Sequence, residues 1–131
     1  MMKWHDTLCD LKHGTPVWFT LAAWMLPAGI GAQFLIAGGA MFQDPRFWDL
    51  HGMLGGLLAI PVLIGMVGAI VIRRLRGFGW WAGVILALYG VQLALAAEAK
   101  PVPLAFHPFN AALLLSASLV QLAKVERRRD L

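Results

Sequence analysis

Charged side chains are scarce in this chain of 131 residues. Lysine, arginine, aspartate and glutamate make up 14% of it and hydrophobic residues 60%, whereas a typical soluble domain carries about 25% charged residues. This composition argues against a soluble globular domain and favours a membrane protein. Cysteine is also almost absent. The single residue, Cys9, excludes a disulfide within the chain.

Most of the chain consists of long apolar segments. Four of them, at about residues 17–42, 45–72, 78–98 and 106–124, approach or exceed the ~18–20 residues that a helix needs to cross ~30 Å of hydrocarbon. A backbone in lipid must satisfy its own hydrogen bonds, so uninterrupted apolar runs indicate helices rather than barrel strands. We predict an all-α fold, a four-helix transmembrane bundle that fills residues 15–131 as one domain. Pro27 and Pro61 predict kinks in the first two spans.

The few cations are distributed unevenly among the connections. Only Arg46 and Lys100, two of the eleven, lie between spans one and two or between spans three and four. The positive-inside rule therefore predicts both termini in the cytoplasm, in a multi-pass protein of the bacterial cytoplasmic (inner) membrane. The basic clusters serve as topology anchors against the lipid bilayer. A nucleic-acid partner is not expected.

The sequence predicts that residues 1–14 form a short separate helix along the membrane surface. Their apolar positions recur at helical spacing, which is typical of an interfacial helix: Trp4, Leu8 and Leu11. His5, Cys9 and His13 follow one another at intervals of four residues and could present metal ligands on this helix. The ordinary interpretation of that spacing is a solvated helix face.

Polar side chains within the spans gather in the outer half of the predicted bundle. Each span contributes to this layer: Gln33 in span one, His51 in span two, Gln92 in span three, and His107 and Asn110 in span four. Polar groups inside a membrane usually face the bundle interior and mark function. Alternatively, Gln33 and Gln92 could bond neighbouring helices, and Asn110 could cap the start of span four.

The functional prediction depends on His51 and His107. Both lie at the outer ends of their spans, so we expect them at one membrane depth. Imidazoles are costly in hydrocarbon, and a pair at matched depth indicates metal ligation, most simply of a heme b iron between spans two and four. The residue four positions deeper is small in each span, Gly55 and Ala111. This spacing leaves room for a flat macrocycle, but it also suits plain close helix packing.

Bis-imidazole iron is six-coordinate, which suits electron transfer. The heme propionates would point to the outer surface, where either Arg46 or Lys100 could pair with them. A single outer heme cannot carry an electron across the whole bilayer. A quinone or a partner subunit would therefore be required.

Three segments carry a resemblance to known families. The runs QFLIAGG at 33–39, LHGMLG at 50–55 and FHPFNAALL at 106–114 resemble a family of small four-span bacterial membrane proteins of unknown function, over roughly residues 30–124. They are also similar to one four-helix half of heme A synthase, and this similarity implies that His51 and His107 ligate heme. Gly52 stands where that family commonly has arginine, and its catalytic carboxylate is absent unless Asp49 serves. The similarity implies heme binding without the synthase reaction.

Two other interpretations remain open. Glycine-rich spans and aromatic faces also suit a non-catalytic accessory or scaffolding subunit of a larger membrane complex, in which the histidines would hydrogen-bond within the bundle or to a partner. A carrier or channel is less favoured because the cytoplasmic half offers no polar path. The sequence does not indicate an enzyme, because no nucleophile lies beside a histidine and a carboxylate.

Overall fold

All regular elements in residues 14–129, the part of the chain that this computed structural model describes, are helices. In chain order they are α1 (Val17–Phe42), α2 (Phe47–Leu57), α3 (Ala59–Val71), the 3-10 helix η1 (Arg73–Phe78), α4 (Gly79–Ala97) and α5 (Pro101–Arg129). Within these residues, four helical segments are long and apolar enough to cross a membrane, with α2 and α3 together forming the second. The predicted all-α, four-helix transmembrane fold is confirmed. The predicted interfacial helix and the possible ligands His5, Cys9 and His13 lie outside the described residues.

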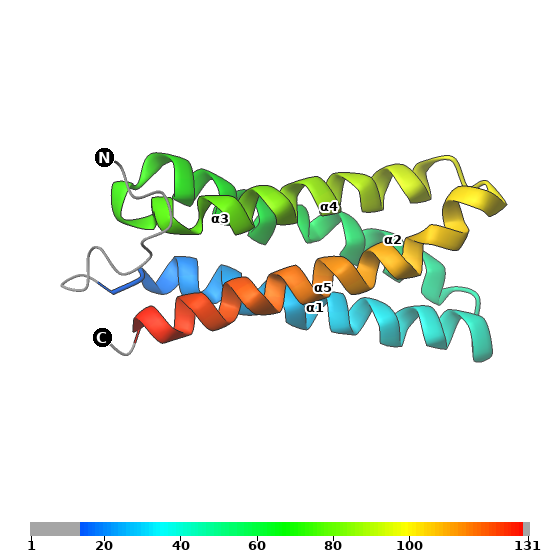
Figure 1. The fold of residues 1–131 in the computed structure, drawn as a ribbon. Helices are drawn as coiled ribbons and strands as arrows, with labels where there is room; N and C mark the ends of the chain where they lie inside the picture. Colours follow the sequence, from blue (N-terminus) through cyan, green and yellow to red (C-terminus); the bar gives the residue numbers. More distant parts are fainter. Residues whose placement is uncertain (1–13, 130–131) are drawn as a thin grey trace.

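These four helical segments, which we call the crossings, run alternately in opposite directions (Figure 1). Going round the bundle, α1 packs on α2 and α3, α3 on α4, α4 on α5, and α5 on α1. The start of α1, η1 and the end of α5 lie at one end, which we call the arginine end. The connections 43–46 and 98–100 lie at the other, which we call the histidine end.

The arginine end is tightly packed. A buried cluster joins α1, η1 and α5: Phe19, Ala23, Leu75, Phe78, Leu122 and Val125. Gly68 lets α3 approach α1 closely, because a Cβ there would lie 3.1 Å from the rings of Trp18 and Phe19. The guanidinium of Arg128 lies 5.5 Å from the ring centroid of Phe78. This half of the bundle is closed by ring stacking and apolar contact.

A second buried cluster crosses the middle of the bundle, and we call it the apolar layer. It is made of residues from every crossing: Leu26, Ile30, Leu58, Val62, Ile85, Tyr89, Leu114 and Ala117. All eight side chains are at least nine-tenths buried. The apolar layer separates the packed arginine end from the more open histidine end.

The second crossing is broken at Leu58, between α2 and α3. Proline has no N–H, so Pro61 cannot donate to the carbonyl of Leu57 four residues earlier. The Leu58 side chain seats against Gly29 of α1, where an added Cβ would overlap it. The structure therefore shows a helix break in span two, whereas α1 continues as one helix through Pro27.

The hydroxyl of Tyr89 on α4 secures the end of α2. It donates to the carbonyl of Gly55 at 2.8 Å, and the carbonyl oxygen of Gly56 lies 3.3 Å from the same hydroxyl. A buried tyrosine hydroxyl needs such an acceptor, and carbonyls next to a helix break need a donor. Tyr89 thus satisfies both groups and ties α4 to α2 beside the break.

We expect Tyr89→Phe to lower the free energy of unfolding by about 1 kcal/mol, since only the hydroxyl and its hydrogen bond are removed. The loss would be measured as a lower melting temperature of the detergent-solubilised protein. Hydrogen exchange at the amides of Leu58, Ala59, Ile60 and Val62 should rise in the same variant. Unchanged melting together with unchanged exchange would contradict a role for the hydroxyl at the break.

The fourth crossing begins earlier than the apolar pattern predicts. It begins at Pro101 instead of near residue 106, and the Leu104 amide donates to the Lys100 carbonyl at 3.1 Å. Proline is favoured in the first turn of a helix, where its missing N–H costs nothing. Asn110 consequently lies well inside α5, and the suggestion that it caps the start of span four is wrong.

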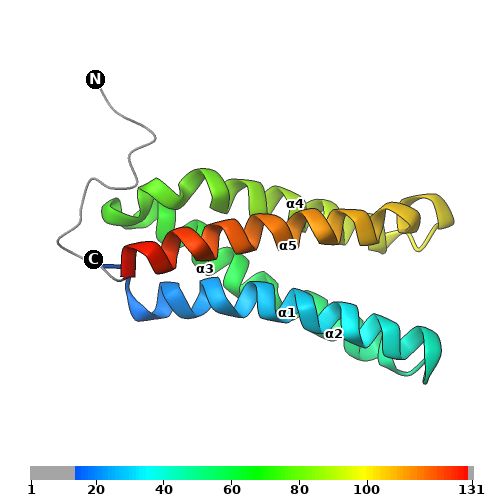
Figure 2. The same cartoon turned by 60° about the horizontal axis from the view of Figure 1, so that its bottom comes forward.

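The helices diverge toward the histidine end. In Figure 2 the pair formed by α1 and α2 moves away from the pair formed by α4 and α5 along the length of the bundle. Before the break, α2 packs chiefly on α1. The two pairs therefore leave space between them at this end.

Candidate functional site

The space between the two helix pairs is a cavity of about 240 Å³, which we call the slot. Typical ligand sites measure about 300–1,000 Å³, so the slot is slightly smaller. Residues of α1, α2, α4 and α5 line it, and many are small: Ala37, Gly52, Gly55, Gly56, Ala96 and Ala111. The missing side-chain volume at these positions helps to create the space.

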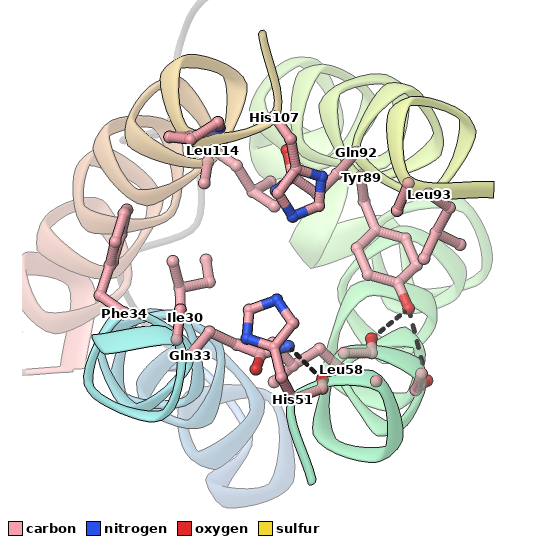
Figure 3. Close-up of a pocket in the computed structure, with 17 residues that line it drawn as sticks. Ile30, Gln33, Phe34, His51, Leu58, Tyr89, Gln92, Leu93, His107 and Leu114 are labelled. Carbon is pink, nitrogen blue, oxygen red and sulfur yellow. Dashed lines mark hydrogen bonds between the residues drawn. The ribbon is translucent and has the colours of Figure 1, made fainter. Parts of the chain in front are cut away.

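His51 on α2 and His107 on α5 stand on opposite walls of the slot (Figure 3). Their rings point toward one another, with centroids 6.2 Å apart and planes inclined by 54°. Metal–imidazole nitrogen bonds are about 2.0–2.1 Å long, so one metal ion between two facing imidazoles places the centroids on the order of 6 Å apart. The observed separation fits that geometry.

A hydrogen-bonded chain fixes His107 on its wall. Asn110 is buried, and its Nδ2 donates to the Leu88 carbonyl at 2.9 Å and to Gln92 Oε1 at 2.7 Å. Because Gln92 Oε1 is the acceptor, Gln92 Nε2 faces His107 Nε2 at 2.9 Å and donates to it. This arrangement holds His107 neutral, with a lone pair on Nε2, the form that binds metals. A metal at Nε2 would displace the Gln92 hydrogen bond, since one lone pair cannot serve both.

His51 is held by its neighbours on α1 and α2. Its backbone carbonyl accepts from Gln33 Nε2 at 3.0 Å, and its ring meets the Trp48 ring edge-on at 5.5 Å. A Cβ at Gly55 would lie 2.8 Å from Gln33 Nε2, so a larger residue there would displace the Gln33 amide. Gln33 therefore joins α1 to α2 at the level of the histidine.

Several polar atoms beside the slot have no partner within the described part of the chain. They are Gln33 Oε1, His51 Nδ1 and His107 Nδ1, all buried. Ligating histidines usually donate their second ring nitrogen to an outer partner. Here Trp48 and Gln92 orient the two rings instead.

The two cations near this end lie outside the slot lining and are already ion-paired. The Arg46 side chain is 89% exposed and contacts Asp44 at 2.6 Å, and Lys100 contacts Glu98 at 2.9 Å. The side-chain hydrogen bond from Arg46 lowers the pKa of the Asp44 carboxyl. The structure therefore does not bring Arg46, one of the predicted cofactor-binding residues, to the site.

Of the other predicted residues, the structure brings five to the slot beside the two histidines or directly behind them: Gln33, Gly55, Gln92, Asn110 and Ala111. Sequence reasoning missed Tyr89, which also lines the slot. The sequence did offer a signal for Tyr89, because it is the one tyrosine in the chain and its polar hydroxyl lies within an apolar span.

No set of three or more histidine, cysteine, aspartate or glutamate side chains comes together in residues 14–129. Within that part of the chain the histidine pair can supply two ligands to a metal, and the others would have to come from the cofactor. This donor set suits a metal that arrives inside a macrocycle.

Comparison with known proteins places the chain in a family without assigning it a function. Residues 33–99 match the Family of unknown function (DUF6220), a segment that includes Gln33, His51 and Gln92 and ends before His107. No curated protein matched, no solved structure matched, and the similarity to heme A synthase found no support in these comparisons. The match covers slightly more than half of the 131 residues. The chain therefore belongs to this family of unknown function.

Proposed function

We propose that the protein binds one heme b between His51 and His107 and transfers electrons at the histidine end. The observation that carries the proposal is the pair of imidazoles facing each other at 6.2 Å across the slot. In Figure 3 open space lies between the two rings, with Phe34 on one side of it and Leu93 on the other. A flat macrocycle between two axial ligands needs space there.

The chain's own residues divide the tasks of binding. His51 and His107 would hold the iron, and the small residues Gly55 and Ala111 keep side chains out of the space beside them. Gln92 donates to His107 Nε2 and so favours a lone pair on the nitrogen that would hold the iron. When bound, the heme supplies a one-electron couple, and two axial imidazoles leave no open position for oxygen.

The slot is smaller than a tetrapyrrole, so binding requires the helix pairs to part further or the ring edge to meet lipid. The fold supports such a movement, because α2 is separated from α3 by the break at Leu58. The apolar layer on the other side of the break is fully packed and can stay in place.

The positive-inside rule supports the orientation of this site. With the arginine end in the cytoplasm, the heme would lie near the outer face of the bacterial inner membrane. Its electron partner would be a lipid-soluble quinone or another subunit of a membrane complex. Either partner would have to approach the histidine end of the bundle.

The proposal is tested by the absorption spectrum of the purified protein from cells supplied with heme. We expect a Soret band, sharp α and β bands on reduction, and one heme per chain, as two axial imidazoles produce six-coordinate iron. A b-type cytochrome expressed in the same cells serves as a control for heme supply. A colourless protein beside a fully loaded control would contradict the proposal.

One observation favours the alternative of an accessory or scaffolding subunit. Gln92, which Asn110 holds in place, already donates a hydrogen bond to His107 Nε2 inside the bundle, as a purely structural histidine would require. In that case the protein would copurify colourless with a larger complex in mild detergent. Gln92→Leu would then weaken assembly with no pigment to lose.

A further inference from the structure

We propose that the slot is loaded sideways from the bilayer, through the edge between α2 and α4. The inference rests on the proposed heme site and adds the route by which the cofactor reaches it. Two edges of the slot face lipid, one between α2 and α4 and one between α1 and α5. They differ in the size of the side chains that line them.

The edge between α2 and α4 is formed by small or apolar residues. Gly52 and Gly56 of α2 and Leu93 and Ala96 of α4 all line the slot, and all are exposed. A Cβ added at Gly52 or Gly56 would meet no atom within 4 Å. This edge is therefore open at the α2 side, and Leu93 is its one bulky side chain.

The base of this edge is held by a hydrogen bond. The Tyr89 hydroxyl reaches the Gly55 and Gly56 carbonyls, and α2 itself packs chiefly on α1. Between Tyr89 and the histidine end, the α2–α4 edge is thus weakly joined. A rigid planar molecule can part α2 from α4 there without disturbing the apolar layer.

The opposite edge is more obstructed. There Phe34 of α1 and Pro108 of α5 line the slot with larger side chains. Figure 3 places Phe34 and Leu93 on opposite sides of the slot. Their exposed fractions are nearly equal, 43% and 45%, so they form a matched pair for testing the two edges.

The chemistry of the α2–α4 edge fits a ligand dissolved in lipid. All four of its residues are apolar and none carries a charge. The apolar ring of a heme whose propionates stay at the outer surface meets little desolvation cost at this edge, whereas a charged group passing through it would meet a large one.

The test measures heme uptake by the full-length apoprotein in lipid vesicles to which hemin is added. Soret absorbance gives the association rate, and transfer to an excess of apomyoglobin gives the dissociation rate. We expect Leu93→Ala to raise both rates at least about threefold above those of Phe34→Ala, because an obstacle on the route slows entry and exit alike. The affinities of the two variants should be similar, since each loses one partly exposed lining side chain. Gly52→Leu should slow both rates.

The other outcomes are distinguishable. Faster rates in Phe34→Ala than in Leu93→Ala would move the entrance to the α1–α5 edge, and equal rates in both would indicate entry from the aqueous end. Either result would contradict the proposed route but would not contradict the heme site. Absence of a Soret band in the wild-type protein would overturn the site itself, and the route with it.

Discussion

Replacing either His51 or His107 by alanine is expected to abolish the six-coordinate heme spectrum. Each ring would supply one of two axial ligands, and no third histidine, cysteine or carboxylate joins them within residues 14–129. Loss of an outer-shell partner of a metal ligand typically costs 10–100-fold in affinity, so loss of the ligand itself should cost at least about 100-fold. The measurement is the heme-to-protein ratio after purification, together with the spin state of any heme that remains.

Matched controls separate ligation from general damage to the bundle. Leu50 and Phe109 lie close in sequence to the two histidines, are exposed, and do not line the slot. Leu50→Ala and Phe109→Ala should keep the wild-type spectrum. Added imidazole should restore a low-spin spectrum to His107→Ala, because the truncated side chain leaves room for it. Unaltered spectra in both histidine variants would contradict axial ligation by this pair.

Asn110→Leu is expected to give the largest loss of stability among the single variants considered. The substitution roughly keeps the volume but removes the donors to Leu88 O and Gln92 Oε1. Interhelical hydrogen bonds in membranes average ~0.6 kcal/mol and reach ~1.7 kcal/mol, while a stranded buried acceptor costs about 1–3 kcal/mol. We therefore expect a loss of about 2 kcal/mol and a melting temperature lower by several degrees. Gln92 would also be free to turn away from His107.

Ser116→Ala is the control on the same helix. The Ser116 hydroxyl is exposed and donates to the Ala112 carbonyl of its own helix at 2.9 Å. Its removal should change the free energy of unfolding by less than about 0.5 kcal/mol. Both variants would be followed by circular dichroism on heating in one detergent. Equal melting of Asn110→Leu and Ser116→Ala would show that the chain from Asn110 to His107 contributes nothing to stability.

The features set by the bilayer could be predicted from the sequence. The first span was expected at 17–42, where α1 lies, and the third at 78–98, close to α4 at Gly79–Ala97. Hydropathy fixes these limits because the membrane requires a certain length of apolar helix. The shared depth of His51 and His107 follows from the same constraint, since each lies near the same end of its span.

The features set by contacts between helices could not be predicted in the same way. Pro61 indicated a kink, but it did not indicate that Leu58 would lie against Gly29 of α1 and that Tyr89 of α4 would bond the carbonyls beside the break. Arg46 was expected near the cofactor because it is one of two cations at that end, whereas Asp44, two residues away, binds it locally. The slot itself results from the divergence of two helix pairs, which leaves no periodic signal in any single span.

The apolar layer would make the protein an insulator for ions. Its buried side chains are apolar except for Tyr89, whose hydroxyl is already bound to backbone carbonyls. A proton or hydroxide needs a continuous chain of water or polar groups, and crossing such a layer without one carries a large solvation cost. Vesicles that contain the protein should accordingly keep a pH gradient as long as protein-free vesicles do, and faster decay would reveal a conducting path that this packing forbids.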